Sequence, residues 1–276
     1  SVPAFITCIV LSLGIITPIL NAMNFTDSIS QMKSVVGELC AVLDEKELER
    51  PEKPVPIQSS NISLENVSFS YADSDEGAGL QNISITIPQG QVVLLCGESG
   101  CGKTTLTRLI NGLIPHFFEG SLTGKVTVCG KDVAGSQLYE LSPLVGSVFQ
   151  NPKSQFYTVD TDSEIVFGCE NIGMPKEQIQ KNLDETINNL NLYRLLNRSL
   201  FELSGGEKQK IACASVSALH PKIFVMDEPS SNLDYKGIRE LMNVIAGWKR
   251  DGCTVIIAEH RLEWLKTLAD RVIYMS

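Results

Sequence analysis

Gly97-Glu98-Ser99-Gly100-Cys101-Gly102-Lys103-Thr104 decides the fold of this chain, because it matches the pattern G-x-x-x-x-G-K-[ST] at every fixed position. An apolar run at 92–96 precedes it, and a helix-competent stretch at 105–113 follows it. A strand, a glycine-rich loop and a helix in this order form the setting in which such a loop binds phosphate. The sequence therefore predicts an α/β protein that binds a nucleoside triphosphate.

The chemistry of this loop follows from its residue types. Gly97, Gly100 and Gly102 allow successive backbone N–H groups to turn toward a polyphosphate, and the helix N-terminus that follows favours negative charge. Lys103 is placed to reach the β and γ oxygens, and the Thr104 hydroxyl to bind Mg²⁺. The predicted ATP-binding residues here are Gly97, Glu98, Ser99, Gly100, Cys101, Gly102, Lys103, Thr104 and Thr105.

A second glycine turn lies about a hundred residues further on. Leu203-Ser204-Gly205-Gly206-Glu207 precedes a helix predicted from 208 to about 219. Ser204 is a suitable N-cap, and the two glycines leave backbone N–H groups open to another phosphate. This turn is predicted to contact phosphate as well.

Two carboxylates follow the apolar run 223–226. Asp227 and Glu228 stand at the C-terminal end of this predicted buried strand, the edge at which open α/β sheets bind ligands. Asp227 is positioned to hold Mg²⁺, directly or through water. Glu228 is positioned to orient or deprotonate an attacking water.

These motifs together resemble the ATP-binding-cassette (ABC) ATPases, from about Asn61 to the end of the chain. Further matches occur in the family's order. Tyr71 closes Val67-Ser68-Phe69-Ser70-Tyr71, Gln150 lies in Val148-Phe149-Gln150-Asn151-Pro152, and His260 lies in Ala258-Glu259-His260-Arg261. Ser231-Asn232-Leu233-Asp234 resembles the loop that crosses between two paired cassettes. Several matches in order are far more specific than any one alone.

The resemblance implies roles for these residues. Tyr71 would stack on adenine, Gln150 would sense the γ-phosphate and Mg²⁺, and His260 would contact the γ-phosphate, so that the predicted catalytic residues are Glu228, His260 and Gln150. The predicted metal ligands are Thr104, Gln150 and Asp227. The signature residues Ser204, Gly205, Gly206 and Glu207 would act on the ATP of a second cassette, in a homodimer or a heterodimer. ATP and Mg²⁺ are the implied cofactors, and a transporter's transmembrane domain is a further partner.

Composition limits the remaining possibilities. The chain has 276 residues, 43% of them hydrophobic, enough to fill a sizeable core. Its formal net charge of −9 argues against nucleic acid as a partner, since binding a phosphate backbone needs a basic surface. Eight cysteines without a C-x-x-C pair indicate reduced thiols in the cytosol.

The first sixty residues differ in kind from the rest. Residues 1–23 are apolar and resemble the end of the last transmembrane helix of an ABC exporter. Residues 24–48 carry an apolar stripe typical of an amphipathic stalk helix, and the charged, proline-rich residues 49–60 are typical of a linker. Both ends look cut, so the chain is expected to be a fragment of a longer protein at a cell membrane, with its cassette on the cytoplasmic side.

Residues 61–276 form the predicted nucleotide-binding domain, with a helical subdomain at about 151–205. The expected fold is an α/β P-loop NTPase with a central, mainly parallel sheet, an antiparallel β subdomain and a helical subdomain, after the membrane-helix remnant. Asp160, Asp162 and Glu164 are expected in a solvated acidic loop rather than at a metal.

The direction of transport stays open at this point. The segments 149–156 and 259–263 are similar to energy-coupling-factor (ECF) and cobalt-importer ATPases, whereas the N-terminal segment resembles an exporter. A soluble ABC ATPase that acts on a macromolecule, without transport, is the alternative function.

Overall fold

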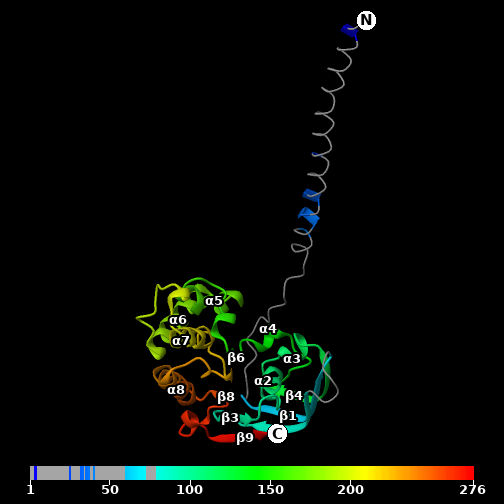
Figure 1. The fold of residues 1–276 in the computed structure, drawn as a ribbon, viewed down its shortest axis with the longest axis vertical. Helices are drawn as coiled ribbons and strands as arrows, with labels where there is room; N and C mark the ends of the chain where they lie inside the picture. The colour runs from blue at the N-terminus through cyan, green and yellow to red at the C-terminus, as the bar shows by residue number, and fades with distance from the viewer. Residues whose placement is uncertain are drawn as a thin grey trace. The chain divides into compact units, whose positions relative to one another are not determined.

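The computed structural model describes residues 60–72 and 79–276, together with a few helical positions before residue 41 (Figure 1). The chain divides into two units, Ser1–Val55 and Pro56–Ser276. Most of the predicted membrane helix, stalk and linker lies outside the described residues. Phe25, Met32 and Val36, on the predicted stalk, are helical and exposed. No helix in the described part of the chain has the length and apolarity needed to cross a bilayer.

A five-stranded parallel sheet organises the second unit. Its order is β6-β7-β8-β3-β9, and every neighbouring pair is parallel. Strands β3, β7 and β8 are short apolar runs buried in the interior, as parallel strands covered on both faces should be, whereas the edge strand β9 is mostly exposed. Their bounds are β3 (Val92–Gly97), β6 (Val145–Val148), β7 (Ile223–Asp227), β8 (Thr254–Ala258) and β9 (Arg271–Met275).

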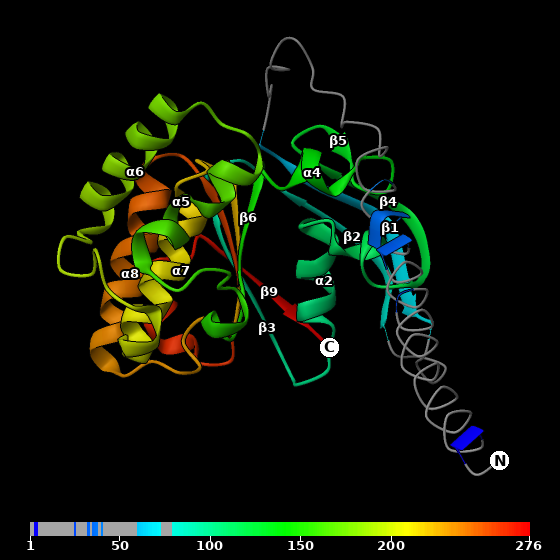
Figure 2. The same cartoon turned by 90° about the horizontal axis from the view of Figure 1, so that it is seen from above.

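The two faces of this sheet belong to two separate cores. Leu94, Phe224 and Ile257 face the core formed with α5 to α8, while Leu95, Val225 and Ile256 face the core formed with α2 and the antiparallel strands. Figure 2 shows this layering, with α2 on one side of β3 and β9 and α5 to α8 on the other. Because side chains alternate along a strand, the one sheet supports both layers.

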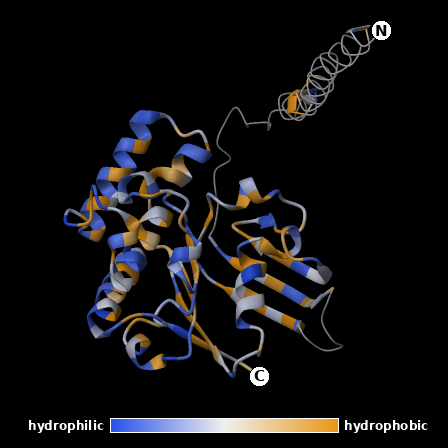
Figure 3. Cartoon of the chain, turned by 45° about the horizontal axis from the view of Figure 1, so that its top comes forward, coloured by the Kyte–Doolittle hydropathy of each residue, from blue (hydrophilic) through white to orange (hydrophobic). Residues whose placement is uncertain are grey.

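The antiparallel sheet has the order β2-β1-β4-β5. Its strands are β1 (Ile62–Tyr71), β2 (Gly79–Ile87), β4 (Gly120–Val128) and β5 (Lys131–Asp132). Burial alternates along β1, where Ile62, Leu64, Val67 and Phe69 point inward. Figure 3, coloured by hydropathy, shows hydrophobic and hydrophilic bands succeeding one another along the strands of the chain. The predicted α/β fold with a parallel and an antiparallel sheet is confirmed.

The helices complete the domain. They are α2 (Lys103–Ile110), α3 (Leu113–His116), α4 (Leu138–Leu141), α5 (Thr161–Asn171), α6 (Lys176–Leu190), α7 (Gly205–Ser217) and α8 (Tyr235–Arg250), with short 3-10 turns at Pro152–Ser154, Leu200–Glu202 and Leu262–Leu265. Helices α5 and α6 lie within the segment predicted to be a helical subdomain.

Two helix predictions were wrong at their ends. The helix expected at 105–113 begins at Lys103 and stops at Ile110, because Gly112 adopts a left-handed conformation with φ of 79° and interrupts it before α3. The helix expected from 208 begins at Gly205, because Ser204 caps it three residues earlier.

The solvated acidic loop was also wrong. Asp160 is the N-cap of α5, with its carboxylate accepting the Ser163 N–H at 2.9 Å. Glu164 is only 2% exposed and accepts the backbone N–H groups of Tyr157 at 3.0 Å and Thr158 at 2.9 Å. These carboxylates hold the start of α5 against the preceding turn, a contact that residue spacing alone does not reveal.

Candidate nucleotide site

The phosphate loop connects the end of β3 to the start of α2. Gly97 requires its glycine, because a Cβ there would lie 2.2 Å from the Met275 carbonyl oxygen. Gly102 is the N-cap of α2 in a left-handed conformation, with φ of 92°, and no side chain caps the helix there. The first N–H groups of α2 are therefore without a side-chain acceptor, which suits an anion.

Lys103 is nearly enclosed by the loop it belongs to. Its side chain is 6% exposed, and its ammonium donates to the carbonyls of Gly97 at 3.0 Å and Glu98 at 2.9 Å. It also approaches Cys101 Sγ at 3.4 Å. The charge stands at the positive end of α2, where it adds to the attraction for a polyphosphate. It is held in place by neutral carbonyl oxygens.

Asp227 and Thr104 form the predicted metal side of the site. Burial raises the pKa of Asp227 above its usual range, and Glu228 raises it further, while a hydrogen bond from Thr104 lowers it. The buried charged carboxylate would be stabilised by a cation. In the described part of the chain, no group of three or more His, Cys, Asp or Glu side chains is arranged to hold a metal ion. One carboxylate and one hydroxyl fit Mg²⁺, which commonly takes few protein ligands and binds substrate phosphates as well.

Glu228 lies between two other predicted catalytic residues. Gln150 Nε2 donates to Glu228 Oε2 at 2.7 Å, and His260 Nε2 lies 3.2 Å from Glu228 Oε1. The Glu228 backbone is left-handed, with φ of 43°, and its N–H donates to the Ala258 carbonyl at 2.8 Å. Such a conformation costs on the order of 1–3 kcal/mol in a non-glycine residue, and it is held here by the surrounding contacts.

Tyr71 lies beside the first turns of α2. Its hydroxyl is 3.2 Å from the Thr105 hydroxyl oxygen and accepts from Arg108 at 3.0 Å. Its ring meets Phe69 and Phe118 edge to face, and the Arg108 guanidinium lies 4.0 Å from the centre of the Phe118 ring. Arg108 and Phe118 therefore fix the position of this aromatic. The sequence reasoning missed both, because neither belongs to a motif.

The signature turn stands at the start of α7, which packs on the sheet face opposite α2. Ser204 and Glu207 form a reciprocal capping box, with Ser204 Oγ accepting the Glu207 N–H and Glu207 Oε2 accepting the Ser204 N–H at 2.8 Å. Glu207 also pairs with Arg198 at 3.1 Å. Among the described residues, the structure brings Gln150, Glu228 and His260 together, and it leaves the signature turn in a different layer from the phosphate loop.

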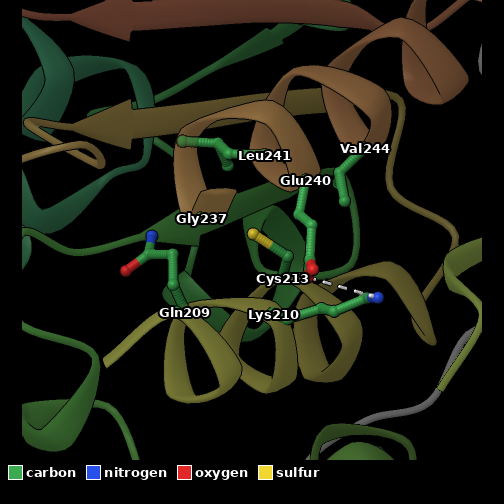
Figure 4. Close-up of a pocket in the computed structure, with 8 residues that line it drawn as sticks. Gln209, Lys210, Cys213, Gly237, Glu240, Leu241 and Val244 are labelled. Atoms are coloured by element: carbon green, nitrogen blue, oxygen red, sulfur yellow. Dashed lines mark ion pairs between the residues drawn. The ribbon is translucent and has the colours of Figure 1, made fainter. Parts of the chain in front are cut away.

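Helices α7 and α8 approach closely behind this turn. Figure 4 shows Gln209, Lys210 and Cys213 of α7 facing Gly237, Glu240 and Val244 of α8, with an ion pair of 3.6 Å between Lys210 and Glu240. A cavity of about 10 Å³ remains between them. A Cβ on Gly205 would lie 3.2 Å from the Asn232 carbonyl oxygen, so the signature turn and the crossing loop touch within one chain.

Comparisons with known proteins agree with this geometry. The family model described as ABC transporter matches residues 80–231. The chain belongs to the ABC transporter family. A Treponema denticola protein named as an ABC transporter ATP-binding protein is 58% identical over 215 residues, covering 78% of this chain and 44% of that protein. A Methanosarcina mazei protein of the same name is 37% identical over 216 residues, covering 78% of this chain and 36% of that protein.

Solved structures of ABC ATPases share the fold. CbiO1 of Clostridium perfringens, part of the ABC transporter complex CbiONQ, matches with a TM-score of 0.70 and 28% identity over 79% of this chain and 86% of its own. An ATP-binding cassette solved as a dimer with ADP and Pi, in a post-hydrolysis state, matches with a TM-score of 0.67 and 25% identity over 78% of this chain and 94% of its own. This chain is thus an ABC-type ATP-binding cassette, and it spans less than half the length of the two curated relatives above.

Proposed function

We propose that this cassette hydrolyses ATP with Mg²⁺ at a site shared by two cassettes, and that the hydrolysis drives a cargo across a membrane. The observation that carries the proposal is the Glu228 carboxylate held between Gln150 and His260, next to Asp227 at the end of β7. A general base needs to lie within hydrogen-bonding reach of water and of groups that orient it. ATP-binding-cassette relatives and solved transporter ATPases support transport over a soluble function.

The residues divide the work as follows. The phosphate loop and Lys103 bind the β and γ phosphates, and Tyr71 stacks on the base. Thr104 and Asp227, together with Gln150, would hold Mg²⁺, which when bound neutralises developing charge on the phosphates. Glu228 accepts a proton from, or orients, the attacking water. His260 and Gln150 fix the Glu228 carboxylate by the contacts described above.

The need for two copies follows from the layering. Ser204 lies on the other sheet face from Lys103, so a second chain must supply the signature turn opposite the phosphate loop. The Ser204 hydroxyl already accepts the Glu207 N–H, and its proton remains available for donation to a γ-phosphate. Two identical chains related by a twofold axis would form two such sites. A heterodimer with a related cassette would form them equally well.

Mixing two inactive variants tests this arrangement. Lys103→Ala removes the phosphate contact in one chain, and Ser204→Arg blocks the signature turn in the other chain. In a mixed dimer both defects fall at the same site, and the second site is intact. Each variant alone is expected to be inactive, whereas an equal mixture should recover about a quarter of the original ATPase activity, since half the dimers are mixed and each has one intact site. Specific activity should also rise with protein concentration. No gain on mixing, with flat specific activity, would contradict the shared site.

The membrane partner would dock on the exposed aromatic side chains of a groove that the predicted metal ligands Thr104, Gln150 and Asp227 also line. The groove has a volume of about 780 Å³ and includes Thr104, Arg108, Phe117, Gln150 and Tyr157. Phe117 is 71% and Tyr157 76% exposed, and both line the same groove, so they place two exposed aromatic rings on one surface. An amphipathic helix of a transmembrane domain fits this mixture of aromatic and polar groups. Gln150 would then lie between that helix and the phosphates of the bound ATP.

The effect of Phe117→Ser tests the docking site. We expect weaker co-purification of the transmembrane domain, with basal ATPase activity kept. Val272→Ser is the control, since Val272 is 58% exposed but lies on β9, outside the groove. Equal retention of the partner by both variants would place the docking site elsewhere.

The match to CbiO1 favours a cassette of the ECF and cobalt-importer type. On this proposal the cassette lies at the cytoplasmic face of a cell membrane. The membrane helix predicted for residues 1–23 rests on sequence alone, as do the domain limits at 24–48, 49–60 and 61–276.

A further inference from the structure

Glu259, next to the predicted switch histidine, is a buried carboxylate that the proposed mechanism does not use. It is 2% exposed at the end of β8, and no Lys, Arg or His side chain of the described residues forms a salt bridge with it. Burial of an unpaired carboxylate is costly unless hydrogen bonds satisfy it. The position of those hydrogen bonds shows what Glu259 connects.

The two oxygens of Glu259 bind two different loops. Oε1 accepts the backbone N–H groups of His260 at 2.8 Å and Arg261 at 3.0 Å. Oε2 accepts the hydroxyl of Ser230 at 2.5 Å and its N–H at 3.4 Å. Ser230 is fully buried and directly precedes the crossing loop Ser231–Asp234. The carboxylate thus joins the switch loop to the start of the crossing loop.

Further contacts make this junction rigid. The Arg261 guanidinium donates to the Ser230 carbonyl at 3.2 Å, and the Glu259 N–H donates to the Leu95 carbonyl on β3 at 3.1 Å. On the outer side, Ser231 Oγ reaches the Gln150 carbonyl at 3.5 Å. Glu259 therefore contacts β3 through its backbone N–H, and the segments that follow β7 and β8 through its carboxylate.

We propose that Glu259 is a positioning residue that fixes the switch loop and the crossing loop as one unit, so that His260 of one site moves together with the loop facing the partner cassette. The inference rests on the proposed two-cassette function. In such a dimer, each crossing loop lies beside the other chain's site. Glu259 then affects two sites: its own through His260, and its partner's through Ser230.

The variant Glu259→Gln can keep the hydrogen bonds to the switch loop while it weakens those to Ser230. The amide keeps one carbonyl oxygen, which can accept the His260 and Arg261 N–H groups, and its NH₂ can donate to the Ser230 hydroxyl. The Ser230 N–H, however, then faces a second donor and loses its acceptor. We therefore expect kcat for ATP hydrolysis to fall about 10-fold to 10²-fold through misplacement, with KM for ATP within about 2-fold. Glu263→Gln, exposed in the same loop, is the matched control and should leave both constants unchanged.

The decisive experiment places Glu259→Gln on chosen sides of a mixed dimer. A full-length chain carrying Lys103→Ala is paired with an unmodified chain through two affinity tags, so that one site works. Adding Glu259→Gln to the unmodified chain tests its own site, and adding it to the Lys103→Ala chain tests the crossing-loop side. Both placements should lower kcat of the surviving site.

The outcomes distinguish the possible failures. If Glu259→Gln in the Lys103→Ala chain leaves kcat unchanged, Glu259 acts only on its own switch loop and the proposal is wrong. If the reference dimer without Glu259→Gln is inactive, the shared-site function itself fails. Should Glu259→Gln not fold, Ser230→Ala removes only the hydroxyl donor and is used in the same two placements, with a smaller expected loss of kcat in both and the same contradicting result.

Discussion

The starts of α2 and α7 are both glycine turns, yet one is open and the other is closed. At α2, a left-handed Gly102 leaves the helix without a side-chain cap, and Lys103 adds positive charge where the helix dipole is already positive. At α7, Ser204 and Glu207 satisfy each other's backbone N–H, and Glu207 adds negative charge that the dipole stabilises.

This difference indicates how each turn treats phosphate. At the start of α2 the backbone N–H groups have no side-chain acceptor, so this turn can bind an anion without a contribution from another chain. The start of α7 is stable by itself, and only its Ser204 hydroxyl proton and glycine N–H groups are left to offer. A turn of the second kind suits a phosphate already held elsewhere, as the proposed shared site requires.

The largest effect is expected from Glu228→Gln, which changes neither glycine turn and should lower the rate of hydrolysis without changing ATP binding. Glu228→Gln preserves the side chain's shape, and its carbonyl oxygen can still accept from Gln150. Loss of the carboxylate should lower kcat by about 10² or more, with ATP affinity kept. Turnover under saturating ATP measures this, with Glu177→Gln on the exposed side of α6 as control. Turnover within about 2-fold of the original would show that Glu228 is not the base.

The next effect tests the open turn. Lys103→Ala removes a charge-assisted contact to phosphate, typically worth about 1.5–3 kcal/mol, so ATP affinity should fall about 10-fold to 10²-fold. Calorimetric titration with ATP measures it, and Lys176→Ala, exposed at the start of α6, is the control. Unchanged affinity would mean that the phosphate loop is not where ATP binds.

The closed turn is tested by three substitutions of Ser204 that cap differently. Asp and Asn cap about as well as Ser, whereas Ala costs about 1 kcal/mol of stability. We expect Ser204→Ala to lower the melting temperature, and Ser204→Asp to keep it while abolishing turnover through repulsion of the γ-phosphate. Ser204→Asn caps the helix without adding charge, so its ATP turnover should lie between that of Ser204→Asp and that of the original protein. Equal turnover for Asp and Asn would show that the turn does not meet phosphate.

The sequence predicted the parallel strands better than the turns. The apolar runs at 92–96 and 223–226 match the observed β3 (Val92–Gly97) and β7 (Ile223–Asp227) to within one residue, because buried strands are short apolar runs with few alternatives. The start of α7 was placed three residues too late, since glycines weigh against a helix in sequence and the Ser204–Glu207 cap outweighs them in the structure.

The parts of the site that the sequence missed depend on tertiary contact. Glu259 was visible only as the neighbour of His260, and its role depends on Ser230, 29 residues earlier in the chain. Arg108 reaches Tyr71 across 37 residues. No local pattern contains either pair. Glu259 and Ser230 meet because the parallel strands β7 and β8 end at one edge of the sheet, and Arg108 meets Tyr71 because α2 lies beside the antiparallel strand β1.

The smallest expected effect concerns Glu207, where the closed turn carries its charge. The hydrogen bond from the Ser204 N–H, followed by the contact with Arg198, lowers the pKa of Glu207 below its usual value of 4.5. A carboxyl with a lowered folded-state pKa stabilises the fold above its unfolded pKa, and this contribution is lost as pH falls through the folded pKa.

Glu207→Gln keeps the capping box, which Gln also supports, and removes only this charge. The melting temperature of the original should therefore exceed that of Glu207→Gln slightly at pH 7, and the gap should close below about pH 4.5. Glu202→Gln, exposed just before the turn, should show no such gap. A gap that widened on acidification would show that the ionised Glu207 does not stabilise the turn.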